Sequence, residues 1–230
     1  MRAYLVKKAI LIGFMACGLT AVASVHAQAQ QMSFRLVPAQ DPAKCGDKCL
    51  QFIAAEGEIV DDTPNKFIEF IDANKHDQRI RTVILFHSPG GKVGAALQLG
   101  FVLRKLGADT VVARALSAPS GGGSGIVAGR CYSSCVYAIM GGKKRVIPLD
   151  SEVGIHRSYV EEYGEPPKRE ILDAKPLVDP DLILKLVGAY SDRMGVSRGL
   201  VEEAQRTSSR SIHIVTRAEM ARWRLAGSRL

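Results

Sequence analysis

Two short segments of this chain carry the residue types that acyl transfer needs. Segment 88–91 reads Ser-Pro-Gly-Gly and ends an apolar run, and segment 131–135 reads Cys-Tyr-Ser-Ser-Cys, with His156 following 23 residues after Ser133. A tight glycine turn before a helix presents bare backbone N–H groups to an anion. A hydroxyl, a histidine and an anion site together are the minimum set for nucleophilic attack on an acyl carbon.

Alternating strands and helices must position these segments. Apolar runs predict strands at 52–55, 82–86, 110–113, 145–147 and 153–155, and helical patterns occur at 64–71, 93–103, 182–194, 197–205 and after the capping box of Thr216 and Glu219. The run at 83–86 is continuous, as is typical of a buried parallel strand. The alternation predicts one α/β domain whose parallel strands are joined by right-handed crossovers.

The N-terminus has the pattern of a secretory signal peptide. Arg2, Lys7 and Lys8 precede an apolar run at 9–25, and a small-x-small site ends at Ala27. We therefore predict a signal peptide at 1–27, a flexible leader at 28–49 and the folded domain at 50–230, in a periplasmic or secreted protein. An uncleaved anchor and a lipid on Cys17 are the alternatives, and we expect membrane attachment only through one of these.

Composition places the chain among globular proteins. Apolar residues make up 47% of the 230 residues, and the formal net charge of +8 falls to about +5 without segment 1–27, which holds three basic residues and no acid. Basic residues are not interleaved with aromatic ones, and the chain has one Trp. We therefore expect no nucleic-acid partner.

Four cysteines remain after the signal peptide is removed, and each pair is four residues apart: Cys45 and Cys49, and Cys131 and Cys135. An even number of cysteines in an oxidising compartment indicates disulfides, and three pairings are open. A bridge between the second pair needs a non-ideal helix start. A zinc site is the alternative, although the spacing is not that of a two-residue knuckle. We expect neither a metal nor a cofactor.

The order of these motifs resembles the ClpP/crotonase superfamily. The run at 57–62, the Ser-Pro-Gly-Gly turn, Ser133 with Gly142 nine residues later, and the pair at 155–156 look like the proteolytic subunit of the Clp protease, and more closely its exported ClpP-like branch. The resemblance covers about residue 50 to the C-terminus. It implies a ClpP/crotonase-like α/β fold and a serine-type hydrolase, with a peptide or protein substrate.

The resemblance also implies roles for single residues. Ser133 matches the nucleophile, His156 matches the general base, Gly91 with help from Gly90 matches one oxyanion donor, and the Ser134 N–H matches the other. The chemistry agrees, because a hydroxyl is a poor nucleophile until a base near neutral pKa accepts its proton.

Each of these residues has a plainer interpretation. A serine at a helix start is usually an N-cap, and Ser134 is the neighbouring candidate for the nucleophile. His87 and His213 are interpreted as structural. At the level of function, the alternatives are a catalytically inactive ClpP-fold binding or assembly module and, more remotely, an oxyanion hole acting on a thioester.

Two departures from the family pattern stand out. The family takes its third triad residue, an aspartate, from a stretch that here reads Thr-Ser-Ser-Arg-Ser-Ile-His at 207–213. Ser208, Ser209 or Asp192 are the substitutes considered for orienting the imidazole. The chain also has no nucleotide-binding motif, and an exported enzyme has no ATP, so we expect no ATP-dependent unfoldase. A homo-oligomer is expected, as is common in this superfamily.

Overall fold

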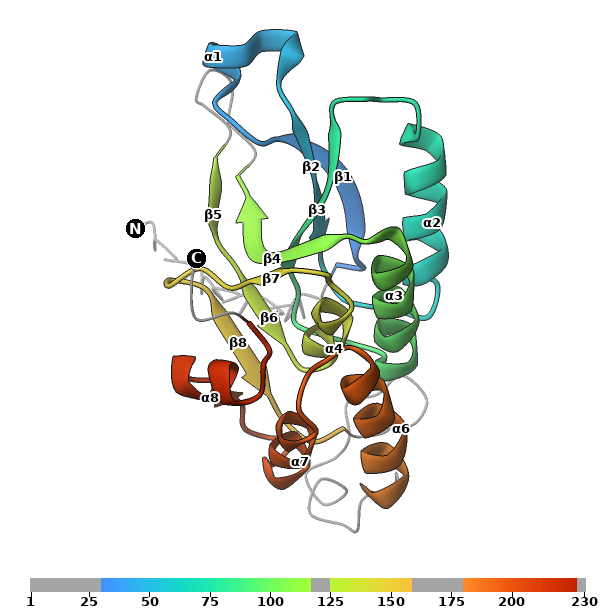
Figure 1. The fold of residues 1–230 in the computed structure, drawn as a ribbon, viewed down its shortest axis with the longest axis vertical. Helices are drawn as coiled ribbons and strands as arrows, with labels where there is room; N and C mark the ends of the chain where they lie inside the picture. Colours follow the sequence, from blue (N-terminus) through green and yellow to red (C-terminus); the bar gives the residue numbers. More distant parts are fainter. Residues whose placement is uncertain (1–29, 117–124, 159–179, 227–230) are drawn as a thin grey trace, which may run out of the picture.

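The computed structural model describes residues 30–116, 125–158 and 180–226 (Figure 1). Within these ranges the main sheet has six strands in the order β1-β2-β3-β4-β5, with β7 also beside β4. The strands are β1 (Ser33–Pro38), β2 (Gln51–Glu56), β3 (Ile80–His87), β4 (Asp109–Ala115), β5 (Ile126–Ala128) and β7 (Arg145–Val146). The segments predicted as strands at 52–55, 82–86 and 110–113 therefore lie in neighbouring strands of one sheet.

The centre of this sheet is parallel. β2 pairs with β3, β3 with β4, and β4 with β7 in parallel register, whereas β1 and β5 are antiparallel to their neighbours. Helix α2 (Thr63–Asn74) connects β2 to β3, and helix α3 (Val93–Leu106) connects β3 to β4. Parallel neighbours need such crossovers, because a tight turn can only reverse the chain. The predicted α/β class with parallel strands is confirmed.

A second sheet of three strands continues from the first. It is formed by β6 (Arg130–Tyr132), β8 (Glu152–Ile155) and β9 (His213–Ile214), in the order β6-β8-β9. β6 and β8 are parallel, and β9 is antiparallel to β8. An isolated parallel bridge between Ser88 and Cys131 connects the end of β3 to β6. The two sheets therefore meet where the chemistry-bearing segments lie.

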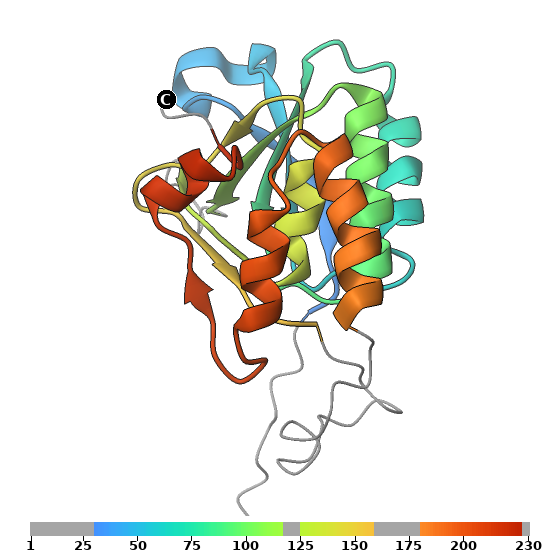
Figure 2. The ribbon, with the colours of Figure 1, turned by 60° about the horizontal axis from the view of Figure 1, so that its bottom comes forward.

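The remaining helices are α4 (Ser134–Met140), α6 (Pro180–Arg193), α7 (Gly199–Arg206) and α8 (Arg217–Arg222), with a short α1 (Pro42–Cys45) and a 3₁₀ turn η1 (Gly46–Lys48) near the start. Helices α2, α3, α4 and α6 lie on one side of the main sheet (Figures 1 and 2). Helix α4 is the innermost, since every one of its residues is buried. Gly107 ends α3 at φ 66°, the left-handed conformation in which glycine commonly terminates a helix.

The flexible leader predicted at 28–49 is corrected for the part that the structure describes. Residues 33–38 form β1, which pairs along its whole length with β2, and Phe34 and Leu36 pack against the core. Arg35 pairs with Glu56 across the two strands. The polar, Gln-rich start of this segment is thus followed by an edge strand, in which Phe34 and Leu36 pack on one side of the sheet and Val37 packs in the cluster on the other.

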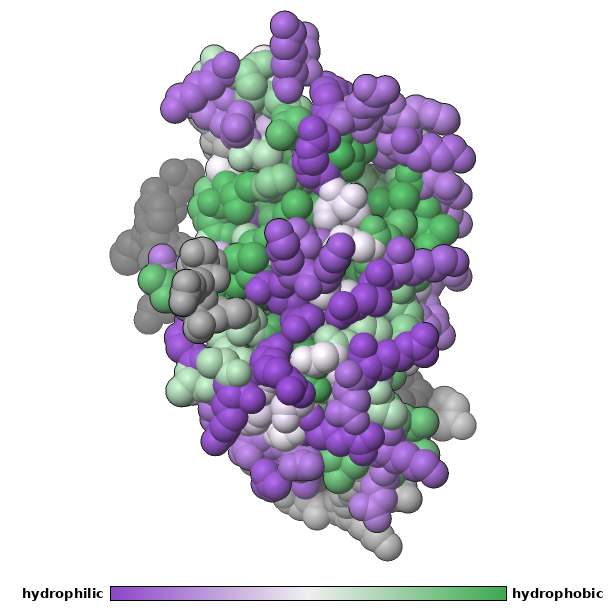
Figure 3. Space-filling model, in the orientation of Figure 1, coloured by the Kyte–Doolittle hydropathy of each residue, from purple (hydrophilic) through white to green (hydrophobic). Residues whose placement is uncertain are grey.

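Several predictions fall outside the described residues. The signal peptide at 1–27 belongs to a range of which the structure says nothing. The sequence also predicts a glycine-rich loop at 117–125 and an irregular segment at 160–180, and the structure describes only Gly125 and Pro180 of these two segments. None of the helices in the described ranges is long and apolar enough to cross a membrane. Hydrophilic and hydrophobic side chains are interspersed over the face shown in Figure 3.

Candidate active site

Three strand ends converge at the candidate site. Tyr132 of β6 is paired with Gly154 of β8, so Ser133 and His156 each follow the carboxyl end of one of two adjacent parallel strands. The end of β3 joins them, because the Ser88 N–H donates to the Arg130 carbonyl (2.8 Å) and the Ser88 carbonyl accepts from the Tyr132 N–H (3.0 Å). Carboxyl ends of parallel strands are where open α/β sheets bind ligands. The sequence-predicted segments thus share one edge of the sheet.

Ser133 has an unusual backbone conformation. Its φ is 54° and its ψ is −128°, and Arg224 is the one other non-glycine residue with positive φ in the described ranges. Holding a non-glycine residue in such a region costs about 1–3 kcal/mol, and such residues cluster at functional sites. The Ser133 N–H donates to the Gly154 carbonyl (2.8 Å), and its carbonyl accepts from the Val136 N–H (3.1 Å).

The interpretation of Ser133 as an ordinary N-cap is wrong. Ser133 stands at the N-cap position of α4, but its side chain makes no capping hydrogen bond. A capping serine has β-region dihedrals and accepts from the second or third N–H of the helix. Ser134 differs from it, because its hydroxyl is fully buried and has no hydrogen-bond partner within the described part of the chain. Ser133, at the half-buried turn, is therefore the serine that a substrate can reach.

The glycine turn lies directly against this serine. Gly90 has a φ of 106°, and a Cβ built on it would come within 2.7 Å of the Ser133 Cβ. Gly91 has a φ of 134°, and its Cβ would meet the Ile59 carbonyl oxygen at 2.0 Å. Only glycine fits either position, because any side chain would meet both a strained dihedral and a clash.

The N–H groups at this turn differ in whether they can bind an oxyanion. The Gly90 N–H donates to the Ser88 Oγ (3.1 Å), so Gly90 provides close approach rather than a free donor. Among the described residues, neither the Gly91 N–H nor the Ser134 N–H has a hydrogen-bond acceptor. The Ser134 N–H is the first of α4 and has no acceptor within its helix. These two N–H groups remain available to a substrate oxygen.

The imidazole of His156 is oriented by backbone. Its Nδ1 lies 2.9 Å from the Arg157 carbonyl oxygen. A carbonyl can only accept, so Nδ1 carries the proton of the neutral ring and Nε2 is the basic nitrogen. Burial lowers the pKa of His156, and the hydrogen bond to the Arg157 carbonyl opposes this shift. The neutral, proton-accepting form therefore dominates at pH 7.

The structure also describes the stretch at 207–213, from which the resemblance to the Clp protease subunit predicted the third triad residue. The Arg157 N–H donates to the Thr207 carbonyl (3.0 Å), so the stretch at 207–213 lies beside the histidine loop although it has no acid. Asp192 instead pairs with Arg198. The Ser208 hydroxyl accepts from the Arg210 N–H (3.3 Å). The structure thus gives neither Asp192 nor Ser208 a hydrogen bond to His156 within the described residues, nor does it give one between the Ser133 hydroxyl and the His156 ring.

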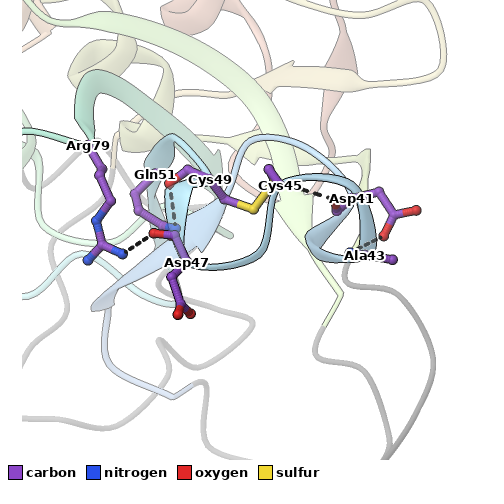
Figure 4. The surroundings of a disulfide bond; sticks show 7 residues. All are labelled: Asp41, Ala43, Cys45, Asp47, Cys49, Gln51 and Arg79. Atoms are coloured by element: carbon purple, nitrogen blue, oxygen red, sulfur yellow. Dashed lines mark hydrogen bonds between the residues drawn. A yellow bond between two sulfur atoms is a disulfide. The ribbon is translucent and has the colours of Figure 1, made fainter.

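The four cysteines form two local disulfides, Cys45–Cys49 and Cys131–Cys135. Of the three open pairings, the chain adopts the one in which each bridge closes a five-residue ring. Figure 4 shows the first ring, where the Arg79 guanidinium donates to the Asp47 carbonyl. Because all four sulfurs are bonded in pairs, the alternative of a zinc site made of these cysteines is wrong.

His87 and His213 have partners of their own. His87 accepts the Arg130 N–H at Nδ1 (3.1 Å), and burial, together with nearby Arg114, lowers the pKa of His87. His213 lies 3.0 Å from the Glu219 carboxylate. Both contacts agree with the structural interpretation of these histidines.

Next to His87 the structure has an open cavity of about 380 Å³. Its lining combines charged side chains with a short backbone stretch: His87, Arg114, Val127, Ala128, Gly129, Arg130, Asp150 and Glu152. Glu152 accepts from the Tyr132 hydroxyl and pairs with Arg130 (3.4 Å). The cavity therefore borders the two strands that lead to Ser133 and His156.

Three site features escaped the sequence analysis: the Arg157 carbonyl that holds the imidazole, the Gly154 carbonyl that holds the Ser133 N–H, and the Ser88 hydroxyl that occupies the Gly90 N–H. Two are backbone atoms, which carry no signature in residue type. The third had one available signal, because a serine two residues before a turn glycine is typical of a side-chain-to-backbone turn.

Comparison with known proteins gives only distant similarity. No family model matches the chain, and no curated protein matches it in sequence. Among solved structures, a serine-to-alanine mutant of the 1510-N membrane-bound stomatin-specific protease is 14% identical, with a TM-score of 0.47, and covers 77% of this chain and 78% of its own.

A lysine-to-alanine mutant of the same protease, in complex with a substrate peptide, is also 14% identical, with a TM-score of 0.48, and covers 77% of this chain and 74% of its own. Likeness at this level concerns the course of the chain, so any functional argument has to come from the residues of this chain.

Proposed function

We propose that this chain is an exported ClpP-like serine hydrolase that acts as an ATP-independent peptidase. The observation that carries the proposal is Ser133, which is held at φ 54° with a hydroxyl that caps no helix, beside a glycine turn and at the end of the strand next to the one that leads to His156. A chain accepts such strain where function requires it. The periplasmic or secreted location and a homo-oligomeric state remain predictions of the sequence.

The proposed reaction begins with attack of the Ser133 Oγ on the substrate acyl carbon. His156 Nε2 accepts the hydroxyl proton, and the carbonyl oxygen becomes an oxyanion held by the Gly91 and Ser134 N–H groups. The leaving amine then takes the proton from His156, and the C–N bond breaks. Water, deprotonated by the same nitrogen, hydrolyses the acyl-enzyme and restores Ser133.

The missing aspartate is compatible with this scheme. In a catalytic triad the third residue fixes the tautomer and orientation of the imidazole. Here the Arg157 carbonyl supports the same tautomer at 2.9 Å from Nδ1. A neutral carbonyl stabilises an imidazolium less than a carboxylate does, so we expect acylation slower than in a full triad.

Labelling with a fluorophosphonate, followed by intact-mass detection, tests the proposal. The reagent should add once to the folded protein, and the adduct should be absent in Ser133→Ala and much slower to form in His156→Ala. Unlabelled, well-folded protein would contradict the proposal and favour the inactive binding or assembly module. Labelling that persists in Ser133→Ala would contradict the choice of nucleophile.

A further inference from the structure

The disulfide Cys131–Cys135 encloses the candidate nucleophile. Ser133 is the middle residue of the five-residue ring that this bond closes, between β6 and the first turn of α4. The Cα atoms of the two cysteines are 5.3 Å apart, and both side chains are completely buried. The bond therefore joins the two elements whose relative position sets the backbone of Ser133.

The second disulfide provides an internal comparison. The ring of Cys45–Cys49 contains Gly46 at φ 53° and ψ −134°, and the ring of Cys131–Cys135 contains Ser133 at φ 54° and ψ −128°. The same backbone conformation thus occurs in both rings. Glycine adopts it without strain in the first ring, directly after Cys45, whereas in the second ring the residue in this conformation, two positions after Cys131, has a Cβ.

Few other contacts hold this strained serine. Its backbone makes one hydrogen bond to Gly154 and accepts one from Val136. Its side chain makes no hydrogen bond within the described part of the chain, so the hydroxyl does not offset the backbone strain. Two backbone hydrogen bonds are worth little more than the strain they oppose, and a covalent cross-link over the turn supplies the remaining constraint.

We propose that the Cys131–Cys135 disulfide is a positioning device that makes the site competent: it fixes Ser133 in the conformation that presents its hydroxyl, and the dithiol chain lacks an activated serine. This inference rests on the proposed function, in which Ser133 is the nucleophile. Each cysteine acts through the backbone and touches no substrate.

The Cys131–Cys135 bond forms by thiol–disulfide exchange. The two thiols give up two protons and two electrons to the disulfide of an oxidoreductase or of a small-molecule oxidant, which leaves as a dithiol or as two thiols. Because both cysteines are completely buried, exchange has to precede the final packing of α4. A chain that folds in a reducing compartment would therefore keep an inactive site.

The test compares two matched double variants, Cys131→Ala/Cys135→Ala and Cys45→Ala/Cys49→Ala. Each removes one disulfide of the same spacing. We expect the second-order rate of fluorophosphonate labelling to fall at least tenfold in the first variant, with an unchanged pH midpoint, and to stay within twofold in the second. Equal rates in wild type and the first variant would overturn the proposal.

Refolding of the wild-type chain covers the case in which the first variant fails to fold. The reduced, denatured chain is refolded in the presence of glutathione disulfide, while peptide mapping follows closure of each ring. Labelling competence should appear with closure of the 131–135 ring. Competence that follows the 45–49 ring, or precedes both, would overturn the proposal.

A conformational readout separates this proposal from the proposed function. Positive φ brings the Hα and H–N of one residue close together, so oxidised protein should show a strong intraresidue nuclear Overhauser effect at Ser133, and reduced protein should lose it. Loss of the effect in a protein that never labels would support the positioning role and contradict the hydrolase. An equal effect in both redox states would overturn the positioning role.

Discussion

The backbone of Ser133 is strained, so the hydroxyl at this position is kept at a cost in stability. Ser133 is half-buried at the turn, and its backbone takes a conformation that favours glycine, at φ 54°. Conformations of this kind cost about 1–3 kcal/mol for a residue with a Cβ. A natural chain that selected stability alone would carry glycine at this position, as it does at Gly46.

Substitution at this position should therefore separate stability from labelling. We expect Ser133→Gly to raise the free energy of unfolding by about 1 kcal/mol, because glycine relieves the strain but loses more chain entropy on folding. Ser133→Ala should leave it within about 0.5 kcal/mol. Both variants should lose fluorophosphonate labelling. Denaturant melts of the three proteins check this, and a destabilised Ser133→Gly would contradict the strain argument.

The pH dependence of labelling should report on His156. Burial lowers the pKa of His156 below its ordinary value of 6.5. Above pH 6.5 the ring is therefore neutral and can accept a proton, and it can no longer act as a base once the pH falls below its pKa. We expect the labelling rate to be flat at pH 7–8 and to fall in acid with a midpoint below 6.5. His156→Ala should abolish this midpoint. A midpoint above 7 would contradict the assigned base.

The lowered pKa of His156 also affects how the stability of the folded chain depends on pH. A histidine whose pKa is lower in the folded than in the unfolded chain leaves the folded state with fewer bound protons. His87 and His156 both shift in this direction because of burial. Stability should be fully present above pH 6.5 and decline as pH falls from 6.5 through the folded pKa values. His156→Gln should flatten part of that decline in urea melts, and an unchanged pH dependence would contradict it.

At the scale of elements, the site depends on how closely the glycine turn approaches two neighbours. Gly90 lies against Ser133, and Gly91 lies against the Ile59 carbonyl. The Ile59 N–H in turn donates to the Gly90 carbonyl (2.7 Å), and the Lys92 N–H donates to the Ile59 carbonyl (2.8 Å). The turn between β3 and α3 is thus clamped on both sides by short backbone contacts.

Alanine at two nearby glycines should have opposite effects. Gly91→Ala should lower the free energy of unfolding by more than about 2 kcal/mol, because its Cβ meets the Ile59 carbonyl and its φ is 134°. Gly94→Ala, in the first turn of α3, has no atom within 4 Å of the new Cβ and should be neutral or stabilising by up to about 1 kcal/mol. Thermal melts compare the two, and equal losses would contradict the assigned close approach.

At the scale of the whole molecule, one guanidinium ties several helix ends together. Arg145 follows α4 and donates to the carbonyls of Leu225 (2.7 Å), Gly142 (3.0 Å) and Arg224 (3.0 Å). These carbonyls directly follow the C-terminal ends of α4 and α8. A cation suits this place, because helix C-termini carry partial negative charge.

Loss of this guanidinium should destabilise the whole domain. We expect Arg145→Gln to lower the free energy of unfolding by about 3 kcal/mol, since several charge-assisted hydrogen bonds are lost and half-buried carbonyls lose their donor. Lys143→Gln, an exposed neighbour, should change it by less than about 0.5 kcal/mol. Denaturant melts followed by circular dichroism compare the two, and a similar small effect in both would contradict the role of Arg145.

Residue order alone determined much of this protein. The alternation of apolar runs and helical patterns predicted the parallel α/β class and the strands at 52–55, 82–86 and 110–113, and the capping box of Thr216 and Glu219 predicted the start of α8. Both candidate motifs were located because glycine, serine and histidine are scarce in apolar runs and mark turns and chemistry. These signals are local, so they survive without knowledge of the fold.

The tertiary structure alone decided what depends on backbone geometry and long-range pairing. Pairing of Tyr132 with Gly154 brings Ser133 and His156 to adjacent strand ends, and it depends on register between segments more than 20 residues apart. Residues 33–38 became an edge strand only because β2 was there to pair with them. The positive φ of Ser133 and the carbonyl that holds His156 have no counterpart in residue type, because backbone dihedrals and backbone oxygens are common to every residue. The choice among the three disulfide pairings was also structural, because it depends on which cysteines the fold brings within bonding distance.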